Sequence, residues 1–113
     1  MTLEPNCIFC KIIAGEIPAN VILETPDALV FEDLTPQAPI HWLVIPKTHV
    51  ASHLEVVDPL VFQHVMQAAQ QALQQQGITS YRLVTNTGAM AGQSVFHWHV
   101  HVLAGRPLHW PPG

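Results

Sequence analysis

Charged side chains are scarce in this 113-residue sequence, and their scarcity limits what the protein can bind. The formal net charge is −4, and the few cationic residues are scattered along the chain: Lys11, Lys47, Arg82 and Arg106. Binding along a DNA or RNA backbone requires many phosphate contacts. We therefore expect no nucleic acid partner, although a single nucleotide could still bind.

Long apolar runs and a leader segment are also lacking. No stretch approaches the roughly 18 consecutive apolar residues that span a bilayer, and no basic region followed by an apolar segment opens the chain. The sequence therefore predicts a cytoplasmic protein without a membrane partner. Only two cysteines are present, Cys7 and Cys10. In a reducing compartment, this Cys-x-x-Cys pair indicates metal ligands or a redox pair rather than a structural disulfide.

The length of the chain predicts one domain over residues 1–113. A content of 49% hydrophobic and 11% charged residues is apolar for so small a protein, which cannot hide all of this surface in its own core. We therefore expect part of the apolar surface to be buried against a second copy, which predicts a homodimer.

Apolar spacing and terminating residues divide the chain into short elements. They predict a short helix over residues 7–14, closed by Gly15, and a long helix between the N-cap Asp58 and Gly77. The long helix should bury a stripe formed by Val61, Val65, Ala69, Ala72 and Leu73. Runs of β-branched and aromatic residues predict strands over residues 21–24, 28–33, 41–45, 81–86 and 96–103. This order predicts an α+β fold, with an antiparallel sheet of about five strands, one long helix and one short helix.

Three histidines alternate with large apolar residues in the last of these segments. Because successive side chains of a strand point to opposite faces, His97, His99 and His101 should share one face. The other face should contribute to the core through Phe96, Trp98, Val100 and Val102. Crowded polar side chains must be hydrated, paired or ligated. The histidine face therefore predicts a site for a phosphate group or a metal ion.

Two chemistries fit such a face. An imidazole is mostly neutral near pH 7 and can attack phosphorus as a nucleophile, whereas three histidines can instead hold a catalytic zinc with an open fourth position. The loop over residues 88–94 contains two glycines and a serine, so its N–H groups and hydroxyl could approach phosphate oxygens. This loop favours phosphate binding, but the pattern by itself leaves both chemistries open.

The segment His97-Trp98-His99-Val100-His101-Val102-Leu103 matches the histidine triad signature, in which three histidines are separated by single apolar residues and followed by two more. The chain thus resembles the histidine triad (HIT) superfamily. The segments at residues 8–18, 31–33, 41–47, 92–95 and 109–113 are similar to those of its Hint branch, which comprises purine nucleoside phosphoramidases. The similarity extends from about Asn6 to the last residue, and implies the HIT-like fold.

The resemblance implies a role for each histidine of the site. His99 would attack the α-phosphorus and become transiently nucleotidylated. His97 and His101 would flank it, stabilising phosphoryl oxygens or assisting the leaving group, and His41 would support the triad from a neighbouring strand. Ser94 would bind the phosphate or the leaving group. Such a reaction combines covalent catalysis with general acid and electrostatic assistance and requires no cofactor.

The same resemblance implies a nucleotide-binding set. Purine and ribose would contact Ile8, Phe9, Ile12, Phe31, Asp33 and Leu34, with the Asp33 carboxylate accepting hydrogen bonds from the ribose hydroxyls. Contacts near the phosphate would come from Asn86, Gly92, Gln93, Ser94, Val95, His99, Val100 and His101. Trp110 would pack close to the site of its own subunit or of the partner.

Bacterial relatives that carry zinc imply a metal-ligand set in which Cys7 and Cys10 are completed by His49 and His97. Two thiolates and two imidazoles suit tetrahedral zinc. A nitrogen of His97 that binds zinc cannot also donate a proton. We therefore expect an optional structural zinc rather than a catalytic one, and the alternative is two thiols without a metal.

The resemblance implies hydrolysis of purine nucleoside 5′-phosphoramidates, in which AMP is linked to an amine, with AMP-lysine and aminoacyl-AMP types as candidate substrates. One alternative is a dinucleoside polyphosphate hydrolase or nucleotidyl transferase that uses the same nucleophile. Another is a nucleotide-binding adaptor with vestigial activity, and a third is the three-histidine zinc enzyme. For the expected homodimer, the long helix and the strand containing Arg82 are the expected interface.

Overall fold

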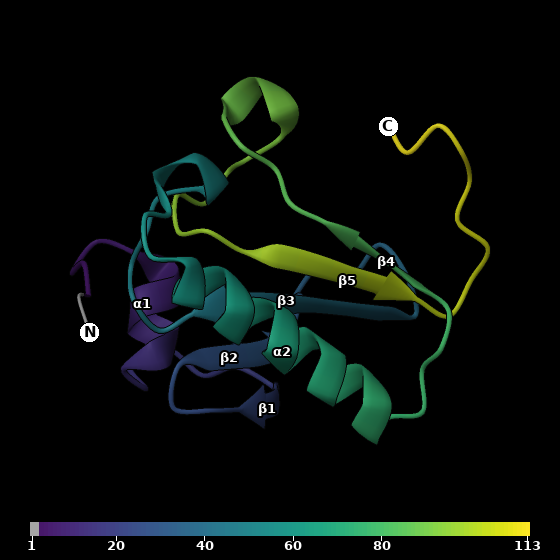
Figure 1. Cartoon of the computed structure of the whole chain (residues 1–113), viewed down its shortest axis with the longest axis horizontal. Coiled ribbons are helices and arrows are strands. Elements are labelled where there is room, and N and C mark those ends of the chain that lie inside the picture. The colour runs from purple at the N-terminus through teal and green to yellow at the C-terminus, as the bar shows by residue number, and fades with distance from the viewer. Residues whose placement is uncertain (1–2) are drawn as a thin grey trace.

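The computed structural model describes residues 3–113, which form two helices, five strands and two short 3₁₀ turns. Met1 and Thr2, which belong to the predicted domain, lie outside the described residues. The elements are α1 (Ile8–Ile13), β1 (Val21–Glu24), β2 (Ala28–Glu32), β3 (Ile40–Pro46), α2 (Pro59–Gln75), β4 (Tyr81–Val84) and β5 (Val100–Ala104). The strands form one antiparallel sheet in the order β1-β2-β3-β5-β4, shown in Figure 1. The predicted α+β fold is confirmed.

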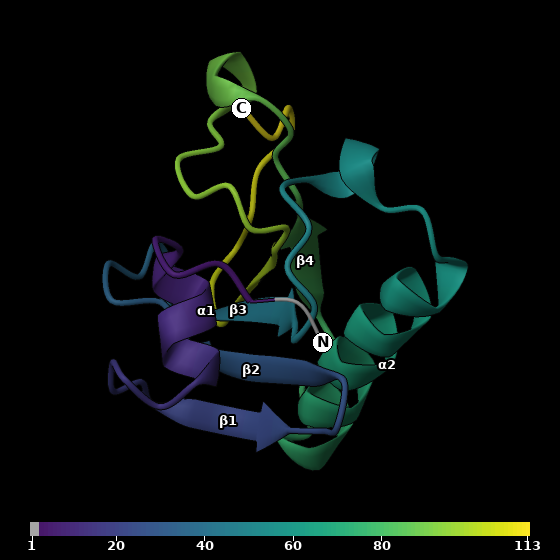
Figure 2. The ribbon, with the colours of Figure 1, turned by 90° about the vertical axis from the view of Figure 1, so that its left-hand side faces the viewer.

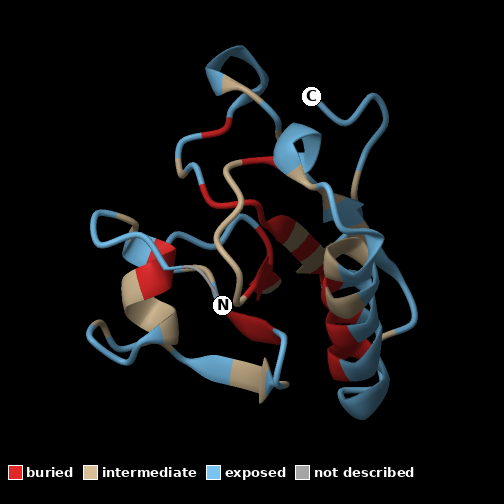
Figure 3. Ribbon diagram, turned by 60° about the vertical axis from the view of Figure 1, so that its left-hand side comes forward, coloured by how far each residue is buried: buried red, intermediate tan, exposed pale blue. Residues whose placement is uncertain are grey.

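Helix α2 is delimited by the residues that the sequence indicated. The Asp58 carboxylate accepts a hydrogen bond from the Leu60 N–H at 3.0 Å, Pro59 occupies the first turn, and Gly77 follows the helix with a φ of 69°. Its buried face consists of Val65, Ala68, Ala69, Ala72 and Leu73, while Val61 is only partly buried. Figure 3 shows this buried face of α2 turned toward the sheet. None of the helices in the described part of the chain has the length and apolar character needed to cross a membrane.

Helix α1 covers the opposite face of the sheet, as Figure 2 shows. Phe9 packs there in a second apolar cluster with Leu29, Phe31, Leu43 and Ile45. Because both faces of the sheet are covered, the central strand β3 is buried along nearly its whole length. This explains its almost continuous apolar sequence.

The histidine segment is a strand over only part of its predicted length. β5 begins at Val100, so His97 and His99 lie in the chain that leads into it. The register that pairs Val44 with Val100 would place Pro46 opposite Trp98, and proline has no N–H to donate. The Trp98 N–H instead donates to the Val50 carbonyl at 2.7 Å.

The side-chain pattern of this segment is largely as predicted. Trp98, Val100 and Val102 lie in the core beneath α2. The prediction for Phe96 is wrong, because its side chain is 52% exposed. The sheet that would have fixed its orientation does not reach that far along the chain.

Candidate active site and metal-ligand cluster

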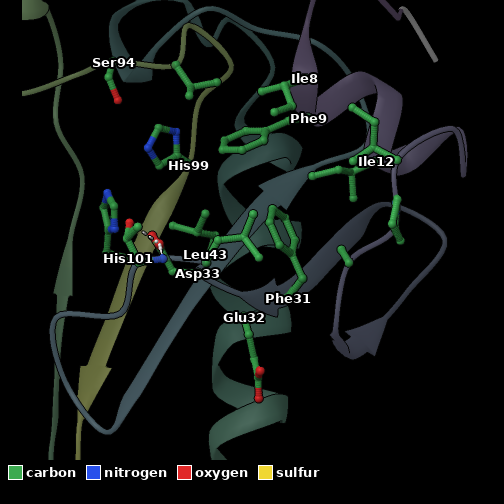
Figure 4. Close-up of a pocket in the computed structure, with 16 residues that line it drawn as sticks. Ile8, Phe9, Ile12, Phe31, Glu32, Asp33, Leu43, Ser94, His99 and His101 are labelled. Atoms are coloured by element: carbon green, nitrogen blue, oxygen red, sulfur yellow. Dashed lines mark hydrogen bonds between the residues drawn. The ribbon is translucent and has the colours of Figure 1, made fainter.

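A cavity of about 250 Å³ lies between α1, the end of β2 and the histidine segment (Figure 4). Ten of the predicted site residues line it: Ile8, Phe9, Ile12, Phe31, Asp33, Leu34, Ser94, Val95, His99 and His101. Its other lining residues are Ile17, Pro18, Ala19, Glu32, Thr35 and Leu43. The wall is therefore mainly apolar; its polar side chains are two imidazoles, the Ser94 and Thr35 hydroxyls and the Glu32 and Asp33 carboxylates.

Sequence reasoning missed those additional lining residues. Leu43 could have been found, because it follows His41 by two positions in β3 and so shares its face. Ile17, Pro18 and Ala19 follow α1, and local sequence patterns do not show that the chain turns back along the cavity there.

Five predicted nucleotide contacts do not line this cavity. Val100 is buried in the core under α2, and Trp110 is 82% exposed in the tail. Asn86 lies beside Gly92, whose backbone φ of 100° is one that glycine adopts readily. The Gln93 side chain is engaged within its own loop and with the segment that contains Ala51: its amide nitrogen donates to the Ala51 and Val95 carbonyls, and its oxygen accepts from the Gly88 N–H. Both amide hydrogens of Gln93 are thus already engaged.

His99 is held in one tautomer by the backbone. Its Nδ1 lies 2.7 Å from the His97 carbonyl oxygen, and a carbonyl can only accept, so Nδ1 carries the proton. The Nε2 atom therefore keeps its lone pair. Burial lowers the pKa of His99, opposed by this hydrogen bond and by Asp33. The result is a neutral imidazole at the cavity wall with a free nucleophilic nitrogen.

His101 and His41 form a second hydrogen-bonded unit. The Nδ1 of His41 accepts from the Gln37 N–H at 3.0 Å, so His41 carries its proton on Nε2. That Nε2 donates to Nδ1 of His101 at 2.9 Å and lies 3.4 Å from Asp33 Oδ2. His101 must then carry its own proton on Nε2, which makes it a hydrogen-bond donor. Burial lowers the pKa of His101 to about 4, helped by His99 and His41 and opposed by Asp33.

The predicted metal ligands converge on the other side of His97. The ligand atoms of Cys7, Cys10, His49 and His97 all lie within 4.8 Å of one another. Nδ1 of His97 is 3.4 Å from Cys7 Sγ, 3.5 Å from Cys10 Sγ and 3.2 Å from His49 Nδ1. His49 Nδ1 is 3.4 Å from Cys10 Sγ. We call these four residues the Cys2His2 cluster.

The spacing of the Cys2His2 cluster fits tetrahedral zinc. Bonds of about 2.3 Å to sulfur and about 2.0 Å to nitrogen place neighbouring sulfur and nitrogen ligands about 3.5 Å apart, and two nitrogens about 3.3 Å apart. The distances above agree with both values. Nε2 of His97 donates to the Pro46 carbonyl at 2.8 Å, which fixes the tautomer and leaves the Nδ1 lone pair toward the thiols.

This arrangement separates the roles of the triad histidines. Both nitrogens of His97 are committed, one to the Cys2His2 cluster and one to Pro46, so His97 has no proton available for a leaving group. The three triad rings also do not form a common ligand set among the described residues. The geometry thus counts against the three-histidine zinc enzyme.

Comparisons with known proteins agree with this fold and triad. The family model for the HIT domain matches residues 14–108. An uncharacterized HIT-like protein of Synechococcus elongatus is 44% identical over 114 residues, covering 98% of this chain and all of that protein. Among solved structures, a HIT family hydrolase from Legionella pneumophila has a TM-score of 0.91 at 45% identity, with 96% of this chain and 100% of that chain covered. A histidine triad protein from Clostridium difficile also has a TM-score of 0.91, at 38% identity and coverage of 96% and 97%.

The antiparallel sheet, the three histidines in and before β5, and these matches define a histidine triad protein. The chain belongs to the HIT family, and it is similar to solved HIT family hydrolases over nearly its whole length.

Proposed function

We propose that this protein hydrolyses purine nucleoside 5′-phosphoramidates through a nucleotidyl-His99 intermediate, as in the Hint branch of the family. The observation that carries the proposal is the His99 tautomer, which leaves an unprotonated Nε2 at the wall of a nucleotide-sized cavity. A neutral imidazole with a free lone pair is the form that attacks phosphorus.

The reaction takes two steps, which are formation of the nucleotidyl-histidine and its hydrolysis. In the first, Nε2 of His99 bonds to phosphorus while the phosphorus–nitrogen bond of the substrate breaks, and the amine leaves after taking a proton through solvent. In the second, the oxygen of a water molecule bonds to phosphorus, the bond to Nε2 breaks, and the water proton returns to solvent. The Nε2–H of His101 donates to a phosphoryl oxygen as charge builds up on it.

The lining of the cavity supports a nucleoside monophosphate unit. Apolar side chains of α1 and β2 suit a purine, and the Asp33 carboxylate suits the ribose hydroxyls. Neither lysine nor arginine lines the cavity within the described residues. Neutral donors suit a single phosphoryl group better than a highly charged polyphosphate chain, which favours the phosphoramidate over the dinucleoside polyphosphate.

The test is AMP release from adenosine 5′-phosphoramidate by the intact protein and by His99→Ala, each with and without chelator. We expect His99→Ala to lower kcat by more than about 10⁴-fold, as when a covalent nucleophile is removed, while AMP binding persists. No turnover by the intact protein despite tight AMP binding would favour the nucleotide-binding adaptor.

For the Cys2His2 cluster we propose a structural zinc. When bound, the ion would neutralise two thiolates and cross-link the N-terminal segment to the histidine segment. The expected result is about one zinc per chain in protein purified without added metal, and a lower melting temperature for Cys10→Ser. No bound metal together with unchanged stability of Cys7→Ser would contradict this proposal.

We further propose a homodimer formed by β4 and α2. β4 is an edge strand, and Tyr81, Leu83 and Met66 are at least 38% exposed around a groove between the two elements. An unpaired edge strand is a template for pairing with another chain. A second copy, related by a twofold axis, would cover these apolar residues and pair its β4 edge with this one.

A further inference from the structure

The donor tautomer of His101 depends on a chain of hydrogen bonds that ends at Gln37. His101 carries its proton on Nε2 because its Nδ1 accepts the Nε2–H of His41 at 2.9 Å. His41 in turn is protonated on Nε2 because its Nδ1 accepts the Gln37 N–H at 3.0 Å. If Gln37 moved away, the proton of His41 could lie on Nδ1 instead. The proton of His101 would then lie on its own Nδ1, which leaves Nε2 with no proton to donate to a substrate.

Gln37 belongs to the largely exposed turn, residues 33–39, that joins β2 to β3. Within the turn, Asp33 Oδ1 accepts from the Thr35 N–H at 2.8 Å and from the Thr35 hydroxyl at 3.2 Å. The side-chain amide of Gln37 donates to the Thr35 carbonyl at 3.0 Å. Exposed turns with local hydrogen bonds open more easily than the strands beside them. The position of the Gln37 N–H therefore depends on contacts from outside the turn.

The guanidinium of Arg106 makes such a contact. It donates to the Gln37 carbonyl from Nε at 3.1 Å and from Nη2 at 3.0 Å, and its Nη1 donates to the Pro107 carbonyl at 2.9 Å. A planar fork of donors fixes orientation as well as distance. Both backbone polar groups of Gln37 are thus engaged, the carbonyl by Arg106 and the N–H by His41.

Gly105 allows the chain after β5 to approach this turn closely. Its φ is 92°, and an added Cβ atom would lie 2.9 Å from Cβ of Pro39. A larger residue would be strained by this backbone conformation and would collide with the proline. Because Gly105 directly precedes Arg106, the close packing brings the guanidinium to Gln37 across 69 residues of sequence.

We propose that Arg106 is a positioning residue of the active site, which holds Gln37 so that His41, and through it His101, stays in the donor tautomer. Arg106 is not among the residues that line the cavity of Figure 4, which we call the nucleotide cavity. It therefore acts without touching the substrate. Its effect on the reaction rests on the proposed function, whereas its effect on the tautomer of His41 requires no reaction.

The first test measures the tautomer in protein without substrate. Long-range ¹⁵N–¹H NMR correlations at pH 7.5 should show His41 protonated on Nε2 in the intact protein, and a mixture of both neutral tautomers in Arg106→Ala. Lys47→Gln is the matched control, because that cation pairs with Glu24 at 2.7 Å and not with the turn; its His41 should match that of the intact protein. If His41 in Arg106→Ala stays protonated on Nε2 alone, the proposal is wrong.

The second test asks whether Arg106 acts through His41. With adenosine 5′-phosphoramidate, we expect Arg106→Ala to lower kcat about tenfold, on the order of one lost hydrogen bond. When His41→Gln is already present, the same change should lower kcat less than about twofold, because the two residues act in one chain. Equal losses in both backgrounds would overturn the proposal. If the intact protein shows no turnover, the proposed function fails, and the NMR comparison alone decides the role of Arg106.

Discussion

The Nδ1 of His99 lies 2.7 Å from the backbone oxygen of His97, whose own ring faces the Cys2His2 cluster. The middle residue of the triad is thus oriented by the main chain of a residue that is itself held by two thiols and a second histidine. His97 acts through His99 as a positioning residue, because its ring has no nitrogen left for a substrate.

These contacts predict the proton positions of three neutral histidines. We expect His99 to be protonated on Nδ1, and His41 and His101 on Nε2. Long-range ¹⁵N–¹H NMR correlations of histidine-labelled protein at pH 7.5 distinguish the two ring nitrogens. A proton on Nε2 of His99 would remove the free lone pair on which the proposed nucleophile depends.

His101 predicts a dependence of stability on pH. Burial lowers its folded pKa to about 4, from about 6.5 in the unfolded chain; the facing groups are His99, His41 and Asp33. Between these two pH values the unfolded chain binds more protons than the folded chain, so stability rises with pH. The contribution of His101 to the stability of the folded protein is therefore complete above about pH 6.5 and is lost as the pH falls toward about 4.

We expect His101→Gln to reduce the drop in melting temperature between pH 7.5 and pH 5. His109→Gln, which changes an exposed histidine of the tail, should leave the drop unchanged. Equal drops in the intact protein and His101→Gln would show that His101 does not titrate in this way.

The buried position of Trp98 predicts a large loss of stability when its side chain is truncated. It is 2% exposed, packs edge-on against Phe62 with ring centroids 5.3 Å apart, and donates from Nε1 to Thr85 Oγ1 at 2.9 Å. We expect Trp98→Ala to lower the free energy of unfolding by about 3–5 kcal/mol, measured by urea denaturation. Trp98→Phe keeps most of the apolar surface and should cost less; an equal loss in both variants would place the stabilisation in the Thr85 hydrogen bond.

The position of Trp98 also shows how far the sequence could predict the fold. Alternation placed Trp98, Val100 and Val102 in the core and the triad on the other face, because that pattern is local. It could not show that Pro46 ends the pairing with β5, which exposes Phe96 and takes His97 and His99 out of the strand. Nor could it show that the Gln93 amide hydrogen-bonds to Gly88 and Ala51, since tertiary structure brings Ala51 to this loop.

The proposed dimer predicts that a charge on the β4 edge separates the subunits. Leu83 is 39% exposed and lines the groove between β4 and α2. A lysine there would bury an unpaired charge at the interface. We expect a dimer for the intact protein and a 12.5 kDa monomer for Leu83→Lys by light scattering at micromolar concentration. Leu54→Lys, at another exposed leucine, is the control, and a monomeric intact protein would contradict the proposal.

Asp33 lines the nucleotide cavity and also lies 3.4 Å from Nε2 of His41, so its effect on the reaction could come from either contact. Oδ1 already accepts from the Thr35 N–H at 2.8 Å, which holds the carboxylate in place. If Asp33 binds the ribose, Asp33→Asn should lower kcat/KM for adenosine 5′-phosphoramidate by roughly 10-fold to 100-fold, the effect of losing a hydrogen bond to a charged group. The 2′,3′-dideoxy substrate has no hydroxyl to lose, so the same variant should change its kcat/KM little. An equal loss on both substrates would instead assign Asp33 to the His41–His101 pair, because that contact is present whichever sugar is bound.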